Sequence, residues 1–135
     1  MRIQEMSKKT GITKRNIHFY IKEELLTPSI DSINGYYDFS EADYKQLLLI
    51  KQLRQTGLSI SNIRSLLQNP ASAEYYLRMH IGRLEQEMEQ IVNNRSTLLS
   101  ILEQLPVSPS FDELYEIYTQ KQYRESIPSS PHGGG

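Results

Sequence analysis

Three consecutive side chains that can donate hydrogen bonds follow a threonine near the start of the chain: Thr13 precedes Lys14, Arg15 and Asn16. Threonine is a favourable N-cap, so a helix is expected to begin directly after it. The first turn of a helix presents unpaired N–H groups and the positive end of the helix dipole, which favour anions such as phosphate. Arginine can pair with both acceptors of guanine, and asparagine can pair similarly with adenine. The chemistry predicted here is hydrogen bonding to a nucleic acid.

Two short helices joined by a tight turn are needed to position these donors. A helical pattern covers about residues 3–9, and Gly11 follows it where the turn requires a flexible backbone. The second helix begins after Thr13 and places Ile17 and Tyr20 at helical spacing, which gives it a side that can be buried. This arrangement is typical of a helix-turn-helix.

A β-hairpin is predicted after the second helix. Pro28 ends that helix, because proline lacks the N–H that a helical hydrogen bond requires. The pair Asn34–Gly35 is a strong hairpin signal, since both residues tolerate a positive φ. Tyr36 and Tyr37 follow directly, and the segment is interpreted as a two-stranded wing.

Two further helices are predicted between residues 40 and 70. Ser40 and Asp43 have the spacing of a capping box, which marks the start of the third helix. Gly57 ends this helix, and Ser59 is the N-cap of a shorter helix over Ile60–Gln68.

A long helix with a narrow apolar stripe is predicted over residues 74–105. Its apolar residues alternate in steps of four and three, which is the heptad spacing of a coiled coil. The apolar members of this stripe are Leu77, Ile81, Leu84, Met88, Ile91, Leu98, Leu102 and Leu105. Arg95 occupies the one remaining stripe position. A single helix cannot bury such a stripe alone, so a second copy of the chain is the expected partner.

A final amphipathic helix is predicted after two prolines, Pro106 and Pro109. Ser110 and Glu113 form a second capping-box pair. One face of this short helix carries Phe111, Leu114, Tyr115 and Tyr118. The last ten residues, SIPSSPHGGG, are of low complexity and are expected to be disordered.

Composition narrows the possible functions. Residues 1–70 carry ten Lys or Arg and seven Asp or Glu, whereas residues 71–135 carry five and nine. The first half of the chain is thus basic and the second half acidic, which fits nucleic-acid binding by the first half.

The chain has no cysteine, which excludes disulfides and thiolate metal sites, and its three histidines lack ligand spacing. No membrane span or signal peptide is predicted, so a cytoplasmic protein is expected. No catalytic triad or phosphate-binding glycine loop can be assembled, so neither an enzyme nor a cofactor is expected.

The first half of the chain resembles the DNA-binding domain of the MerR family. The motifs that carry the resemblance are the KKTGITKR turn, Phe19–Tyr20, Leu25–Leu26 before a proline, Asn34–Gly35–Tyr36, Phe39–Ser40–Glu41 and GLSISNIRSLL. The resemblance covers about half of the chain almost without gaps, and the long helix matches by architecture. The family usually has arginine at the positions of His18 and Tyr37, so two phosphate-binding cations are missing here.

This resemblance implies a mainly α fold, with a winged helix-turn-helix head followed by a long antiparallel coiled-coil dimerisation helix. The expected divisions are a DNA-binding domain at 1–70, a dimerisation helix at 71–105, and a C-terminal helix and tail at 106–135. It also implies a homodimer that binds a pseudo-palindromic operator in double-stranded DNA. Such a regulator responds to an effector by distorting the promoter DNA so that RNA polymerase can use the promoter.

The residues expected to contact DNA lie on the second helix and in the wing. On the helix they are Thr13, Lys14, Arg15, Asn16, His18, Phe19 and Tyr20, and in the wing Asn34, Gly35, Tyr36 and Tyr37. Phosphate contacts set the position of such a protein, and base contacts read the sequence. Packing in the core is an equally good reading for at least one of Phe19 and Tyr20.

A non-metal effector is predicted, because mercury-type and copper-type sensors of the family need cysteine ligands. The candidate residues for a small organic effector are Tyr75, Tyr76, Arg78, Arg95, Phe111, Tyr115 and Tyr118. Simple packing is the alternative for the tyrosines. In that case there is no small ligand, and the C-terminal helix binds a partner protein or only braces the dimer. For Arg95 the alternatives are a device that sets the coiled-coil register and a side chain that extends to water.

Two other functions fit part of the pattern. An excisionase-like DNA bender without effector control would share the wing but not the long heptad helix. A helical adaptor would share the heptads but would need neither a basic helix end nor an Asn–Gly wing.

Overall fold

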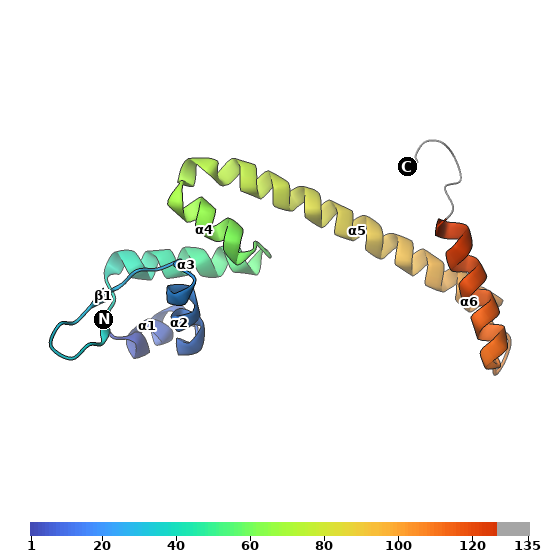
Figure 1. The fold of residues 1–135 in the computed structure, drawn as a ribbon, viewed down its shortest axis with the longest axis horizontal. Coiled ribbons are helices and arrows are strands. Elements are labelled where there is room, and N and C mark those ends of the chain that lie inside the picture. Colours follow the sequence, from blue (N-terminus) through green and yellow to red (C-terminus); the bar gives the residue numbers. More distant parts are fainter. Residues whose placement is uncertain (127–135) are drawn as a thin grey trace. The chain divides into compact units, whose positions relative to one another are not determined.

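A computed structural model describes the backbone of residues 1–126 and the side chains of residues 1–120 (Figure 1). Its helices are α1 (Ile3–Thr10), α2 (Lys14–Lys22), α3 (Glu41–Gln55), α4 (Ile60–Gln68), α5 (Ala73–Gln104) and α6 (Phe111–Ser126). A two-stranded sheet is formed by β1 (Ser29–Ile30) and β2 (Tyr37–Asp38), and a 3-10 turn covers Pro70–Ser72. The mainly helical fold predicted from the sequence is confirmed. The chain divides into two compact units, a head unit of Met1–Ile81 and a stalk unit that begins at Gly82.

The turn between α1 and α2 is built around Gly11. This residue has a φ of 74°, and its N–H donates to the carbonyl of Ser7, which closes α1. The Lys51 ammonium from α3 donates to the carbonyl of Thr10 at 2.8 Å. A Cβ on Gly11 would lie 2.9 Å from that ammonium, but the flexible end of a lysine can move at little cost, so the positive φ is the main reason for glycine at this turn.

The core of the head unit lies where α1, α2, α3 and α4 meet, and α1 packs against both α2 and α3 (Figure 1). Its largest fully buried side chains are Met6, Ile17, Leu25, Leu26, Leu47, Ile50, Leu58 and Ile63. Arg64 of α4 ties the core to the end of α2, since its guanidinium contacts both the carbonyl of Glu23, at 2.7 Å, and the carboxylate of Glu23, at 2.9 Å.

The wing forms as predicted, but its turn does not use Asn34 as expected. The strands pair antiparallel, with Ser29 opposite Asp38 and Ile30 opposite Tyr37. Of the two turn residues only Gly35 has a positive φ, at 74°. The Asn34 side chain instead accepts a hydrogen bond from the N–H of Tyr36 at 3.0 Å. The loop is therefore longer than a two-residue hairpin, and asparagine acts through its side-chain oxygen.

The start of α5 is anchored on the turn between α3 and α4. His80 is 7% exposed, and its Nε2 lies 2.6 Å from the carbonyl of Thr56. The neighbouring Gly57 has a φ of 90°, and a Cβ there would lie 3.2 Å from the same ring nitrogen. Glycine therefore lets the imidazole approach the backbone of the turn closely.

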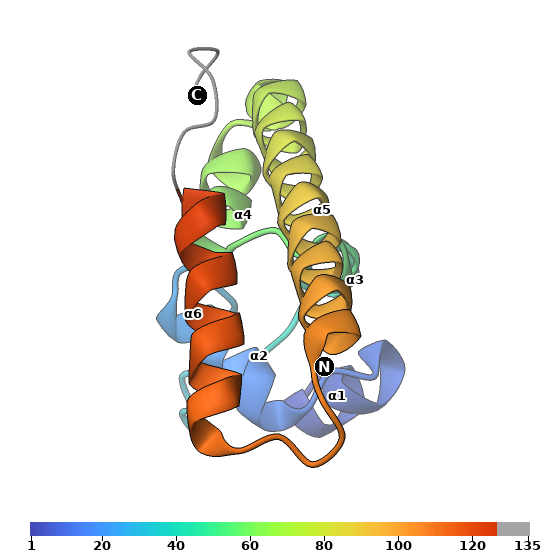
Figure 2. The same cartoon turned by 90° about the vertical axis from the view of Figure 1, so that its right-hand side faces the viewer.

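In the stalk unit α6 folds back beside the end of α5 (Figure 2). Thr97 and Ile101 on this part of α5 are buried. The capping box before α6 is confirmed, with Ser110 and Glu113 each accepting from the other's N–H. The helix continues to Ser126 and is longer than the short helix predicted. Nearly all of the tail predicted to be disordered, residues 127–135, lies outside the described residues. None of the helices in the described part is long and apolar enough to cross a membrane.

Two glycine-to-alanine substitutions are expected to change stability in opposite directions. Gly57→Ala should lower the free energy of unfolding by about 1–2 kcal/mol, because alanine is strained at positive φ and its Cβ crowds His80. Gly82→Ala is the matched control: Gly82 lies within α5 with open space at its Cβ, so alanine should raise stability by about 0.5–1 kcal/mol. Urea unfolding at one protein concentration measures both, and equal effects of the two substitutions would contradict this assignment.

Candidate nucleic-acid interface

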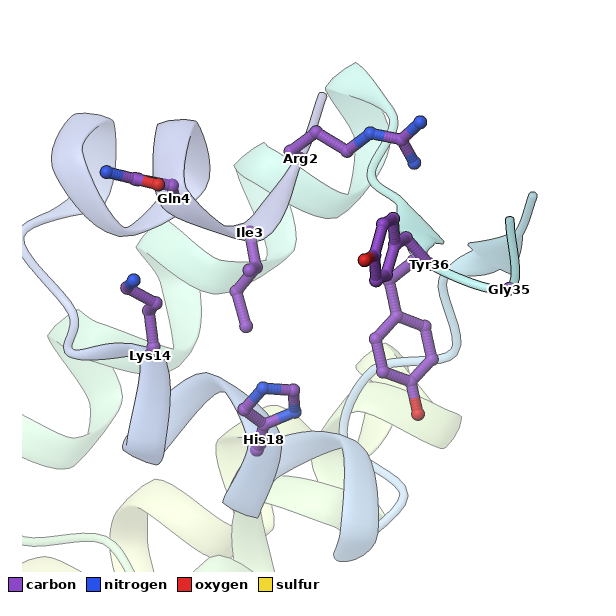
Figure 3. Close-up of a pocket in the computed structure, with 8 residues that line it drawn as sticks. Arg2, Ile3, Gln4, Lys14, His18, Gly35 and Tyr36 are labelled. Atoms are coloured by element: carbon purple, nitrogen blue, oxygen red, sulfur yellow. The ribbon is translucent and has the colours of Figure 1, made fainter. Parts of the chain in front are cut away.

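A groove in the head unit brings together α1, α2 and the wing (Figure 3). It has a volume of about 560 Å³. The residues that line it are Arg2, Ile3, Gln4, Lys14, His18, Gly35, Tyr36 and Tyr37. Lys14 and His18 extend into it from α2, while Gly35 and Tyr36 come from the wing (Figure 3). Two segments predicted separately to bind nucleic acid therefore share one surface.

The N-terminal end of α2 has the predicted cap. The Thr13 side chain accepts a hydrogen bond from the N–H of Asn16 at 3.1 Å. Lys14, Arg15 and Asn16 are exposed, whereas Ile17 is fully buried beneath them. The buried side of α2 thus fixes the helix in the core, and its first turn presents three donor side chains to solvent.

Arg2 positions the wing against the start of α1. Its guanidinium lies 3.3 Å from a carboxylate oxygen of Asp31 and 5.6 Å from the centre of the Tyr36 ring. A cation over an aromatic face adds attraction to that of the ion pair. Both contacts are on the surface, where each contributes little alone, but together they join the wing to the helical part of the groove.

Asp31 also organises the wing loop from within. Its carboxylate accepts from the N–H of Ile33 at 2.9 Å, and its own N–H donates to the carbonyl of Tyr36 at 2.7 Å. The hydrogen bond from Ile33, with smaller contributions from Arg2, holds the pKa of Asp31 below its usual value. The charged carboxylate is thus the form that fits the loop.

The aromatic residues predicted to bind DNA separate into two groups. Phe19 is 43% exposed, whereas Tyr20 is 8% exposed and belongs to the hydrophobic core. The packing alternative therefore describes Tyr20, and its contact with DNA stays a prediction. Tyr37 lies in the groove with its ring centre 6.1 Å from that of His18.

Three residues that line the groove from the start of α1 were not predicted from the sequence: Arg2, Ile3 and Gln4. A cation directly before the first helix is a weak signal by itself. Its role follows from the fold, which places it next to a wing about 30 positions later in the sequence.

The predicted dimerisation residues lie on α5 or directly after it, and most are exposed in the single chain. Leu77, Ile81, Leu84, Met88, Ile91, Leu98 and Leu102 are each at least 39% exposed, and Leu105 is half-buried. A stripe of large apolar side chains is thus left uncovered along the helix.

The candidate effector residues belong to different units. In the head unit, Tyr75 and Tyr76 contact each other edge to face, and Arg78 pairs with Glu74 at 2.9 Å. In the stalk unit, Phe111 and Tyr115 stack, and Tyr118 is 42% exposed. Arg95 lines a shallow hollow on α5 of about 390 Å³ with Ile91, Asn94, Leu98, Leu99 and Leu102. Among the described residues, no group of three or more His, Cys, Asp or Glu could hold a metal ion.

Comparison with known proteins gives matches along most of the chain. Residues 1–70 match the family described as MerR HTH family regulatory protein, and residues 44–101 match the family described as MerR, DNA binding. The HTH-type transcriptional regulator CueR of Yersinia pestis is 31% identical over 113 residues, which cover 78% of this chain and 81% of that protein. A probable heavy metal-dependent transcriptional regulator of Haemophilus influenzae is 32% identical over 98 residues, covering 67% and 77% respectively.

A similar fold is found in the transcription regulator PbrR691 of Ralstonia metallidurans, whose structure was solved with lead(II). The TM-score is 0.75, with 21% identity over 89% of this chain and 98% of that one. At this identity the likeness concerns the fold alone.

Proposed function

The chain belongs to the MerR family of helix-turn-helix transcriptional regulators, and we propose that it acts as a homodimer on a pseudo-palindromic operator. As a member of this family it is a DNA-binding regulator of transcription and not an enzyme. In the proposal the two heads bind the two halves of the operator and distort the DNA between them, so that RNA polymerase can use the promoter.

The groove is the observation that carries the proposal for DNA contact. Arg2 and Lys14 supply positive charge beside the first turn of α2, and the wing forms the opposite wall. Phosphate oxygens are the anions that this combination of cations, phenols and helix N–H groups would bind. In the proposal Thr13, Lys14, Arg15 and Asn16 contact bases or phosphate from α2, and the wing contacts the flanking backbone. The other candidates for these contacts are His18, Phe19, Tyr20, Asn34, Gly35, Tyr36 and Tyr37.

Arg15→Ala is expected to weaken DNA binding by about 1–3 kcal/mol if Arg15 reads a base, and to relax discrimination between sequences. Arg83→Ala, which removes an exposed arginine from α5 outside the proposed DNA and effector contacts, is the control and should leave affinity unchanged. Fluorescence anisotropy measures both effects. It compares binding to a duplex taken from upstream of the gene that encodes this chain with binding to an unrelated duplex. Wild-type affinity should also fall steeply with salt. Salt-independent binding, or an Arg15→Ala variant that binds like wild type, would argue against this interface.

The exposed stripe on α5 supports the proposal of a homodimer. Heptad spacing over four repeats suits a partner helix of similar length, and a second copy of α5 provides one. The divisions proposed for the chain follow: residues 1–70 bind DNA, residues 71–105 dimerise, and residues 106–135 contribute the C-terminal helix and the tail.

Leu84→Lys should convert the protein to monomers or unfold it, because burying a leucine contributes roughly 1.5–3 kcal/mol and a buried lysine would be unpaired. Gln86→Lys introduces the same residue two positions away, on the outer side of the heptad, and should leave the dimer intact. Sedimentation equilibrium at micromolar concentration distinguishes the two. A wild-type protein that remains a monomer there would overturn the proposal.

For the effector we infer a small organic molecule and not a thiophilic metal. One relative is described as heavy metal-dependent and another was solved with lead(II), but this chain contains no cysteine. Copper(I), mercury(II) and lead(II) prefer thiolate ligands, which no residue of the chain supplies. The hollow beside Arg95 and the aromatic side chains of α6 favour a ligand with an apolar body and an anionic group.

Aromatic carboxylates such as salicylate and benzoate should raise the melting temperature, whereas copper(I) and lead(II) should not. The expected increase depends on the side chains of α6, so the double variant Tyr115→Ala with Tyr118→Ala should lose it and still bind DNA. If the double variant instead dissociates into monomers in the absence of ligand, the two tyrosines stabilise the dimer and do not bind a ligand. Stabilisation of wild type by lead(II) would contradict the inference.

The two other functions considered from the sequence are less well supported. Family membership argues against an adaptor that does not bind DNA. An architectural DNA bender without effector control would show the same DNA binding but no ligand-dependent change in transcription.

A further inference from the structure

We propose that binding of DNA in the groove is coupled to the uptake of a proton by His18, so that affinity rises as the pH falls. This rests on the proposed function, because it takes the groove to be where phosphate binds. It concerns a property of this chain's own side chains.

His18 is placed where an incoming phosphate would meet it. It lies one helical turn after Lys14, and residues four apart share a helix face. Its ring is exposed and points into the groove, opposite Ile3 and beside the wing (Figure 3). Tyr37, with its ring centre 6.1 Å away, closes the groove on the wing side.

The charged groups that face His18 are of one sign. Arg2 from the segment before α1 and Lys14 from α2 are cations, and the other polar lining residues are Gln4, Tyr36 and Tyr37. Within the described part of the chain, none of the residues that line the groove carries a carboxylate. Asp31, which lies behind Arg2, is already paired with that guanidinium. The groove therefore lacks an internal anion for a protonated imidazole, and DNA would supply one.

The chemistry of imidazole then fixes the direction of the coupling. A neutral ring has one N–H donor, whereas the protonated ring has two donors and a positive charge. A nearby phosphate favours the charged form, so the DNA complex takes up a proton from the buffer onto a ring nitrogen. Histidine side chains in general change charge between about pH 5 and 8. The extra affinity is therefore expected at the acid end of this range and is expected to be absent at its alkaline end.

The experiment measures the affinity of the intact protein for a mixed-sequence duplex of about 30 base pairs at low salt, where phosphate contacts dominate. From about pH 6 to about pH 8, wild-type affinity should fall by roughly fivefold to tenfold for each His18 engaged. Circular dichroism at both pH values checks that the fold is unchanged.

Two variants identify the titrating group. His18→Arg keeps a permanent cation and should bind tightly at both pH values. His18→Gln keeps a neutral donor and should bind at both pH values with the weaker affinity that wild type has at high pH. Loss of the pH dependence in both variants supports the proposal, and a dependence that persists in His18→Gln overturns it. Salt-sensitive wild-type binding without pH dependence overturns this inference alone, whereas no binding at any salt concentration overturns the proposed function as well.

Discussion

The burial of one side of α2 is the constraint on which the candidate interface depends. Ile17 is fully buried and Tyr20 nearly so, which locks the rotation of the helix about its axis. With that side fixed, the first turn and the face carrying Lys14 and His18 must point outward. Because a helix repeats every 3.6 residues, a shift of one position would turn these donors into the core and leave apolar side chains in water. The hydrophobic core thus determines which surface can meet a phosphate.

The wing completes the interface through polar contacts instead of apolar packing. Its strands are only two residues long, and a hairpin of this size is marginal on its own. Asp31 holds the loop from inside, and Arg2 connects it to the start of α1. Exposed contacts of this kind are individually weak, so the wing depends on several of them acting together.

Much of the fold could be predicted from the sequence because its signals are local. Thr13, Ser40 and Ser59 each accept the hydrogen bond expected of an N-cap, and heptad spacing predicted α5 to within one residue at either end. The turn of the wing was predicted less well, since the backbone angle of Asn34 depends on the longer loop that Asp31 organises. The role of Arg2 could not be read from local patterns, because its partners are far away in sequence. The burial of Tyr20 and the exposure of Phe19 depend on the exact rotation of α2, which adjacent aromatic residues do not reveal.

Together, α2 and the wing are proposed to form the surface that binds DNA. The most direct test follows the amide chemical shifts of isotope-labelled protein during titration with duplex DNA. The duplex is taken from upstream of the gene that encodes this chain. The largest changes should fall at residues 13–18 and 34–37, with small changes along the exposed face of α3. Changes concentrated on α3 or α4, with the first turn of α2 and the wing unaffected, would contradict it.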